Sequence, residues 1–167
     1  MELAKRNEVP VELTWDLSAI YPSEAAMQAD ADWIEQTARE IEQEFKGKLT
    51  DVKTILRCLD QYRALIERGN LVGSYCHLAA EVDYTDAALQ ERSAKIRRIW
   101  AQAASRLSFI DSELLAGDEA VLRAAASEEG PNRPLLEELL RQKPYQLSPE
   151  TERVLMALSP SLNAPYH

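Results

Sequence analysis

Hydrophobic and polar positions alternate with the period of an α-helix along most of this chain. The first clear example follows Ser23, a typical N-cap residue, with Glu24 in the first turn where the helix dipole favours an anion. It ends at Gly47, which suits the left-handed position that follows a helix. The apolar residues between these points are three or four apart, a spacing that places them on one stripe of a helix. They are Met27, Ala31, Ile34, Ala38, Ile41 and Phe45.

A second helical pattern follows Thr50 and Asp51, which are predicted to be the cap and first turn of the next helix. The stretch Arg68-Gly69-Asn70 interrupts it, because glycine costs about 1 kcal/mol relative to alanine inside a helix. The sequence leaves open whether one long helix bends near Gly69 or two helices lie nearly in line. The apolar positions on either side are Val52, Ile55, Leu59, Tyr62 and Ile66, then Val72, Tyr75, Cys76, Ala79 and Val82.

The third pattern begins after the turn Asp83-Tyr84-Thr85-Asp86, which holds two candidate caps, and is predicted to end at Gly117. One face is apolar and the opposite face is charged, as expected of a helix with one side in the core. The apolar face consists of Leu89, Ser93, Ile96, Trp100, Ala103, Leu107, Ile110 and Leu114; the opposite face carries Glu91, Arg92, Lys95, Arg97, Arg98 and Gln102.

Shorter helices are predicted toward the C-terminus. Asp118 should cap one that ends near Ser127, and after a Pro-rich break a second should cover 134–142. Residues 143–147 are predicted to be an extended link. Ser148, with Pro149 at the first helical position, then gives a strong start signal for a last helix, whose apolar side holds Leu155, Met156 and Leu158 before Ser159-Pro160 ends it.

These patterns predict an all-α fold. Strand-type alternation is absent from the sequence, so we expect an antiparallel bundle of about three long helices crossing at about 20°, with two or three shorter helices at the C-terminal end. Residues 1–14 are predicted to be an N-terminal arm, 15–160 a helical lobe and 161–167 a tail. Trp15, Leu17, Ile20 and Tyr21 are expected to anchor the start of the lobe on the bundle.

Composition narrows the class of protein. The 167 residues are enough for one domain with a sizeable core, and 46% hydrophobic residues argue against disorder. The net charge of −9 argues against a nucleic-acid partner, because phosphate contact needs clustered Lys and Arg. Two cysteines are too few for a disulfide scaffold, nothing before Val9 resembles a signal peptide, and no apolar run is long enough to cross a membrane. We therefore expect a cytoplasmic protein without membrane contact.

Candidate chemistry in these residues is sparse. His77 and Glu81 share a helix face and could make half of a metal site, but a surface contact is the commoner finding for such a pair. Buried free thiols are expected for Cys58 and Cys76. The remaining candidates are interpreted as solvated faces, caps or a chain end: the pairs Glu128-Glu129, Glu137-Glu138 and Asp83/Asp86, the basic cluster Lys95, Arg97 and Arg98, and the terminal His167. We assign no catalytic or metal-binding residue to this chain.

Several segments, in order, resemble the N-terminal part of oligoendopeptidase F, a family of zinc metallopeptidases. The segments are Trp15-Asp16-Leu17-Ser18-Ala19-Ile20-Tyr21-Pro22-Ser23, then Phe45-Lys46-Gly47-Lys48-Leu49, the region from Tyr75 to Asp86, and Leu139-Leu140-Arg141-Gln142-Lys143-Pro144-Tyr145-Gln146-Leu147-Ser148 with Glu152. The family commonly has His where this chain has Tyr145. Together they cover roughly Leu13 to Pro160.

The resemblance implies that this is about the first quarter of a longer peptidase. In the family, zinc is held by a His-Glu-x-x-His helix and a downstream Glu, and the metal polarises the scissile carbonyl while the motif's Glu serves as general base. None of these residues occurs here, so zinc is implied for the full-length family and this chain alone is expected to be inactive. Its helices would help to wall a channel that admits short peptides.

Two alternatives stay open from the sequence: a freestanding helical interaction module, and, ranked lowest, a metal-dependent enzyme that uses His77. A His-Glu-x-x-His motif downstream in the reading frame would favour the peptidase, and a stop codon would favour the module. A lobe separated from its larger body should also expose apolar side chains. We therefore expect self-association through the second side of the 134–142 helix and the 148–158 helix.

Overall fold

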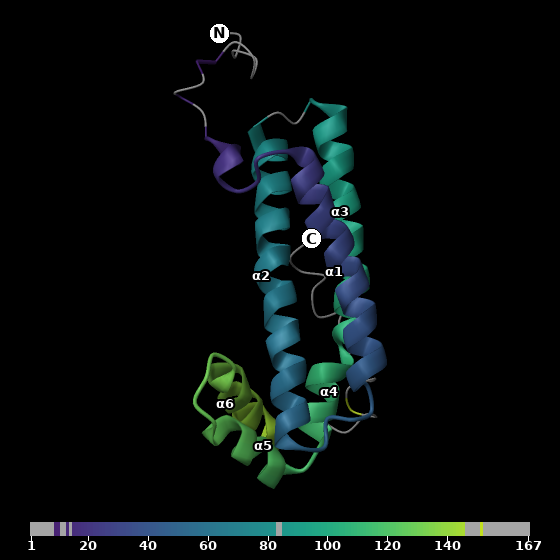
Figure 1. Ribbon diagram of the computed structural model, residues 1–167, viewed down its shortest axis with the longest axis vertical. Coiled ribbons are helices and arrows are strands. Elements are labelled where there is room, and N and C mark those ends of the chain that lie inside the picture. Colours follow the sequence, from purple (N-terminus) through teal and green to yellow (C-terminus); the bar gives the residue numbers. More distant parts are fainter. Residues whose placement is uncertain (1–8, 11–12, 14, 83–84, 146–150, 152–167) are drawn as a thin grey trace.

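The computed structural model describes residues 9–10, 13, 15–82, 85–145 and 151, and within them it is helical with no strand. The predicted all-α fold is confirmed (Figure 1). Predictions for the tail and for most of the arm and the last helix fall outside these residues. The three long helices are α1 (Glu24–Phe45), α2 (Val52–Val82) and α3 (Ala87–Leu107); the shorter ones are α4 (Phe109–Ala116), α5 (Glu119–Ser127) and α6 (Arg133–Gln142), and two short 3₁₀ turns are η3 (Leu17–Ala19) and η4 (Lys143–Tyr145).

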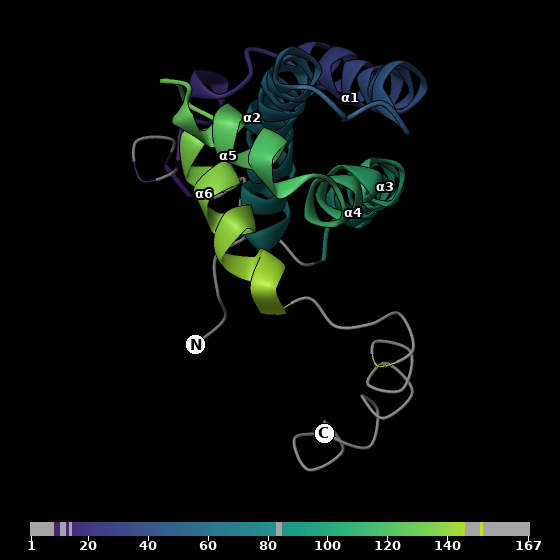
Figure 2. The same cartoon turned by 90° about the horizontal axis from the view of Figure 1, so that it is seen from below.

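In the view of Figure 1, α1 runs down, α2 up and α3 down, as predicted for an antiparallel bundle. Each of the three packs against the other two, so that α1 lies across the pair formed by α2 and α3 (Figure 2). The short helices gather at one end, where α5 packs on α6 and on the first turns of α2. The core therefore has a long part inside the bundle and a smaller extension under α5 and α6.

Helix α1 forms as predicted, from cap to end. The Ser23 hydroxyl accepts a hydrogen bond from the Ala26 amide at 3.2 Å, and all six residues of the predicted stripe are buried. Gly47 follows with a φ of +77°, the left-handed conformation that glycine adopts without strain. Its amide donates to Glu113 Oε1 at 2.7 Å, which ties the end of α1 to α4.

Helix α2 is one continuous helix, which settles the alternative that the sequence left open. Its cap is Asp51, whose carboxylate accepts from the Thr54 amide at 3.0 Å, so the prediction that Thr50 caps this helix was wrong. The helix continues through Gly69 because that residue is packed by a side chain from α3: a Cβ placed at Gly69 would lie 2.1 Å from Cζ3 of Trp100. Glycine here allows close contact between two helices and does not end one.

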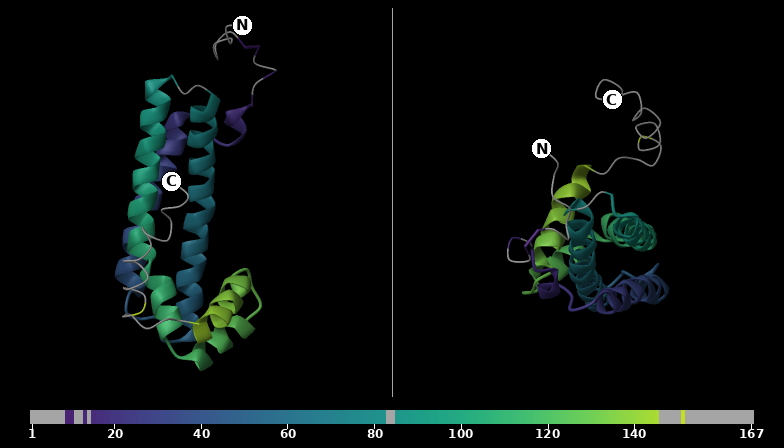
Figure 3. Two further views of the ribbon diagram at one scale, coloured as in Figure 1. Left: turned by 180° about the vertical axis from the view of Figure 1, so that it is seen from behind. Right: turned by 90° about the horizontal axis from the view of Figure 1, so that it is seen from above.

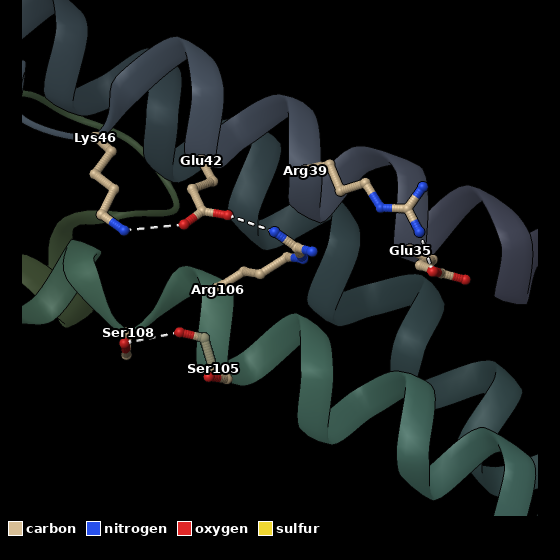
Figure 4. A network of polar contacts seen from close by, with 7 residues as sticks. All are labelled: Glu35, Arg39, Glu42, Lys46, Ser105, Arg106 and Ser108. Carbon is tan, nitrogen blue, oxygen red and sulfur yellow. Dashed lines mark hydrogen bonds and ion pairs between the residues drawn. The ribbon is translucent and has the colours of Figure 1, made fainter.

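The third predicted helix is divided into α3 and α4 at Ser108, which the sequence did not indicate. The Ser108 hydroxyl donates to the Ser105 carbonyl at 2.9 Å, a side-chain bond that competes with the regular backbone ladder (Figure 4). The apolar stripe survives the interruption, because Ile110 and Leu114 are buried as predicted.

The connection after α5 carries a buried polar contact. Asn132 is 7% exposed, and its amide nitrogen donates to Asp60 Oδ1 of α2 at 2.7 Å. At the end of α6, the Lys143 ammonium donates to the carbonyls of Leu115 and Gly117, the latter at 2.7 Å. The prediction of an extended link was wrong at 143–145, where the chain forms η4; the lysine contacts hold this turn against the end of α4.

The expected N-terminal anchor is smaller than predicted. Tyr21 is buried, its hydroxyl donates to Asp30 Oδ2 at 2.8 Å, and its ring meets Tyr75 edge to face at 5.6 Å. Ile20 packs on the core beside it. Trp15 is 70% exposed, so its assignment to the anchor was wrong. It precedes the turn η3, which Asp16 caps by accepting from the Ser18 amide, and the bundle begins only after that turn.

Candidate functional site

The main apolar candidate site in the described part of the chain is a groove of about 600 Å³ between α2 and α3. Figure 3 (left) looks onto this side of the molecule, where α2 and α3 lie in front of α1. Ala31 and Ile34 of α1 contribute to its floor. The walls come from α2, through Gly69, Asn70, Val72, Gly73, Ser74, Cys76 and His77, and from α3, through Ser93, Ile96, Arg97, Ile99, Trp100 and Ala101.

Two glycines on α2 shape this groove in opposite ways. The Trp100 ring lies directly over Gly69 and closes the groove there. Four residues later, one turn along the same face, a Cβ at Gly73 would have no atom within 4 Å. Gly73 therefore keeps the middle of the groove deep at the cost of helix propensity. The sequence marked only Gly69 as an interruption of the helix and could not indicate a groove.

Polar groups at the groove are few and lie toward its rim. Arg97 donates to the Ser93 hydroxyl at 3.2 Å, and His77 is exposed at the outer edge of α2. Cys76 is buried in the wall, with its Sγ 3.8 Å from Sδ of Met27. Burial raises the pKa of the Cys76 thiol, so it is not an activated nucleophile. This arrangement is suited to bind an apolar segment and offers no group for bond cleavage.

The burial of both cysteines gives a direct test. We expect iodoacetamide to alkylate Cys58 and Cys76 at least about tenfold more slowly in the native chain than after unfolding, because both thiols are buried and poorly ionised. Burial raises the pKa of Cys58 to about 12. Mass spectrometry of timed samples with and without denaturant measures both rates. Rapid labelling of either cysteine in the folded chain would contradict this placement.

A charged ridge (Glu35, Arg39, Glu42, Lys46 and Arg106) joins α1 to α3 on another side of the bundle (Figure 4). Glu42 lies at its centre and accepts from Lys46 at 2.9 Å and from Arg106 at 2.8 Å. These two hydrogen bonds hold the pKa of the Glu42 carboxyl below its ordinary value of 4.5. Glu35 pairs with Arg39 within α1. Each cation on the ridge faces a carboxylate, so the ridge joins helices and is not a free anion site.

The lowered pKa predicts how Glu42 contributes to stability. Because the carboxylate is favoured in the folded state, its contribution should be present above the ordinary pKa near 4.5 and lost as the pH falls through the lowered value. We expect the melting temperature of the wild type to exceed that of Glu42→Gln at pH 7 and the difference to vanish toward pH 3. Glu35→Gln, which removes a pair within one helix, is the matched control and should show a smaller difference at pH 7. A difference that is constant with pH would contradict the assignment.

The residues considered as metal ligands do not come together in the described part of the chain. His77 Nδ1 lies 3.6 Å from Glu81 Oε1, and both side chains are exposed on α2, so they form the surface contact that the sequence favoured. Among the described residues no three His, Cys, Asp or Glu side chains gather as metal ligands would. His167 and Asp83 lie outside the described residues. Within the part described, the side chains do not fit a zinc site.

The other charged candidates have structural roles. Asp86 caps α3, accepting from the Ala88 and Leu89 amides at 2.9 and 3.1 Å. Lys95, Arg97 and Arg98 are exposed on α3, as predicted, and Lys95 donates to Gln28 of α1 at 2.9 Å. The remaining pairs are also on the surface: Glu137 pairs with Arg133, Glu138 with Arg141, and Glu128 and Glu129 are exposed.

The sequence did not reveal an aromatic and arginine cluster at the N-terminal end of α1. Arg68 lies 4.1 Å from the centre of the Trp33 ring and 3.1 Å from Asp30, the residue that also binds Tyr21. Burial, followed by the hydrogen bond to Asp30, raises the pKa of the Tyr21 hydroxyl. These residues join α1, α2 and the segment before α1, and no local spacing in the sequence relates them. They fix the N-terminal segment on the bundle.

A second part of this cluster involves Arg92 of α3. Its guanidinium lies 5.4 Å from the centre of the Tyr75 ring and 3.2 Å from Glu24 at the start of α1. The side chain is only 16% exposed, so its aliphatic part is packed between helices. The sequence pattern places Arg92 on the solvent face of the third helix; that prediction is wrong, because the guanidinium lies over the Tyr75 ring.

No helix in the described ranges is both long enough and apolar enough to cross a membrane.

Comparisons with known proteins match this chain to peptidases. A family model described as oligopeptidase F matches residues 113–167, from within α4 onward. Oligopeptidase PepF of Bacillus subtilis is 26% identical over 98% of the chain, and the plasmid oligoendopeptidase F of Lactococcus lactis subsp. cremoris is 23% identical over 96%. The chain spans only about a quarter of these relatives, 25% and 27% of their lengths. The resemblance predicted from the sequence is thus confirmed, and it is limited to about a quarter of each of these relatives.

The fold also has a close match among solved structures. A crystal structure of a candidate peptidase from Chlamydophila abortus aligns with a TM-score of 0.79 over 98% of this chain and 28% of the other, at 18% sequence identity. At that identity the match establishes the fold alone. The arrangement of the helices is therefore one that a much longer protein also contains.

Proposed function

Proceeding from the resemblance to the N-terminal region of oligoendopeptidase F, we propose that this chain is the N-terminal helical lobe of a longer zinc metalloendopeptidase that hydrolyses short oligopeptides. The observation that supports it most is the pattern of coverage: 96–98% of this chain matches about a quarter of each of two relatives. The lobe would be inactive alone, with zinc held by residues outside it. A cytoplasmic location and short unfolded peptides as substrates belong to the same proposal.

The lobe would act as a wall of the substrate channel and limit the size of the peptides that enter. The length and packing of its helices support this role. Helix α2 spans 31 residues, about 46 Å at 1.5 Å per residue, and packs along both other long helices. Charge pairs such as Glu42 with Arg106 join the outer edges of α1 and α3. A wall of this kind contributes to catalysis by excluding large substrates and supplies no reacting group.

A chimeric enzyme tests this function. The corresponding N-terminal quarter of Bacillus subtilis PepF is replaced by this chain, and cleavage of a short fluorescence-quenched peptide is measured in the presence of zinc. We expect the chimera to cleave the peptide and the enzyme without its N-terminal quarter to be unstable or inactive. Correct folding of an inactive chimera, shown by an unchanged helical spectrum and zinc content, would contradict the proposal.

The chain alone provides the complementary test. We expect it to bind no stoichiometric zinc and to cleave no peptide. Zinc binding or cleavage would favour the hypothesis of a metal-dependent enzyme that uses His77. The freestanding interaction module is supported by the apolar groove, which could receive a helix. Capture of a defined amphipathic helix by the isolated chain, combined with an inactive but folded chimera, would favour the module over the lobe.

A further inference from the structure

The apolar groove between α2 and α3 has a permanently charged side chain at its rim. Arg97 lines the groove from α3 and donates to the Ser93 hydroxyl at 3.2 Å. Among the described residues no carboxylate pairs with Arg97, and none of those that line the groove is Asp or Glu. In a chain with a net charge of −9, this leaves a positive rim beside an apolar floor. The groove is therefore complementary to a ligand with an apolar body and one negative charge.

The charge and the open space in the groove lie at the same level. Figure 3 (left) shows α2 and α3 side by side, running in opposite directions. The Trp100 ring packs over Gly69, so these two residues mark one level of the helix pair. Four residues from each, about 6 Å along the helix axes, Gly73 lies at the level of Ile96 and its neighbour Arg97. The space over Gly73, where an added Cβ would have no atom within 4 Å, is thus level with the cation.

This arrangement fits the last residue of a peptide. In a C-terminal residue the carboxylate and the side chain are attached to the same carbon atom, so one can pair with Arg97 while the other enters the space over Gly73. A guanidinium can bind a carboxylate through two parallel hydrogen bonds. We propose that this groove binds the C-terminal end of short peptides, with an apolar last side chain over Gly73 and the terminal carboxylate on Arg97.

The two ends of the groove favour a chain end over the middle of a chain. The Trp100 ring closes the groove on one side of this level, so a peptide cannot continue in that direction. On the other side the lining extends four residues further, to His77 on α2 and Ser93 on α3, which is about 6 Å. That length holds about two extended residues. Their backbone groups would pass the exposed side chains of Ser74 and His77, both of which can form hydrogen bonds.

The inference rests on the proposed function in one respect, because the peptides bound are taken to be substrates of the longer peptidase. A lobe that holds the last residues of a peptide would set the distance from the free C-terminus to the bond that is cleaved. The substrate class is then short peptides with an unblocked C-terminus and an apolar last residue.

An NMR titration of the 167-residue chain tests the inference from the side of the ligand. The probe is the peptide acetyl-Ala-Ala-Phe with a free carboxylate, and the matched control is the same peptide with a C-terminal amide. We expect saturable shifts of the Gly73 amide and of the Trp100 indole N–H. The affinity for the acid should be at least about tenfold higher than for the amide, because only the acid offers Arg97 a charge.

Variants test it from the side of the groove. Arg97→Gln should lower the affinity for the acid to that for the amide, whereas Arg98→Gln, which removes the next exposed charge outside the groove, should leave both affinities unchanged. Gly73→Leu should abolish binding of both peptides by filling the open space. It should remain folded, because leucine is a better helix former than glycine. Ala104→Leu, at an exposed position on α3 outside the groove, should bind like the wild type.

Equal affinities for acid and amide, no shift at Gly73 and Trp100, or equal effects of Arg97→Gln and Arg98→Gln would overturn the inference. Sodium decanoate that binds the same residues more tightly than the peptide would also overturn it and assign the groove to alkyl carboxylates. None of these measurements involves cleavage, so the two proposals can fail separately. An active chimera without peptide binding here would contradict this inference alone, and peptide binding with a folded but inactive chimera would contradict the proposed function.

Discussion

Replacing Phe45 with alanine is expected to lower the free energy of unfolding by about 3–5 kcal/mol, the cost of a large cavity in a packed core. Phe45 is 1% exposed, and its ring packs at the end of α1, where that helix meets α2 and the Gly47 turn. The guanidinium of Arg57 lies 5.6 Å from the ring centre and loses that contact too. Urea unfolding followed by circular dichroism measures the change.

Trp15→Ala is the matching aromatic control. Because Trp15 is 70% exposed, we expect its removal to change the free energy of unfolding by less than about 0.5 kcal/mol. The sequence alone would predict similar losses of stability for Phe45 and Trp15, since both lie in strongly apolar segments. A large loss on replacing Trp15, or a small one on replacing Phe45, would contradict the core described here.

Gly69→Ala is expected to destabilise the chain by about 1–2 kcal/mol, because overpacking against Trp100 outweighs the gain in helix propensity. The added Cβ would lie 2.1 Å from Cζ3 and 2.6 Å from Cη2 of the indole, so the ring has to move. Such a movement would break the contact that the ring now makes with α2. Thermal and urea unfolding measure the loss.

Gly73→Ala, one turn along the same helix, is the control and should stabilise the chain by about 0.5–1 kcal/mol. A double-mutant cycle then isolates the steric term: Trp100→Leu should remove most of the penalty of Gly69→Ala and leave the effect of Gly73→Ala unchanged. Equal effects of alanine at the two glycines would show that Trp100 does not pack over Gly69.

The long helices could be predicted from the sequence because their signals are local. The stripe from Met27 to Phe45, the Ser23 cap and the Gly47 end all act within one helix, and each is found where it was expected. The sequence fails to decide, or predicts wrongly, where a distant residue matters. It left the helix open at Gly69, where the Trp100 ring from α3 packs, and it placed Arg92 in solvent, although the guanidinium lies over the Tyr75 ring.

The apolar groove could not be predicted from the sequence, because it too depends on residues that are distant in the chain. A groove depends on how far α2 and α3 separate over α1, and no residue spacing within one helix encodes that distance. The helical spacing did indicate correctly that Cys58 and Cys76 would be buried and that His77 and Glu81 would meet on the surface. The similarity to known peptidases then supplied what neither the patterns nor the packing contain, namely the kind of longer protein that has this fold.

The most direct test of the account is the peptide-length profile of the chimera in which this chain replaces the N-terminal quarter of Bacillus subtilis PepF. Values of kcat/KM are measured for a series of quenched peptides with one cleavage site and increasing flanking length. We predict that kcat/KM falls steeply beyond a limiting length, because the proposed role of the lobe is to narrow the channel. A profile that stays flat from short peptides to unfolded proteins would contradict the role of this lobe as a wall.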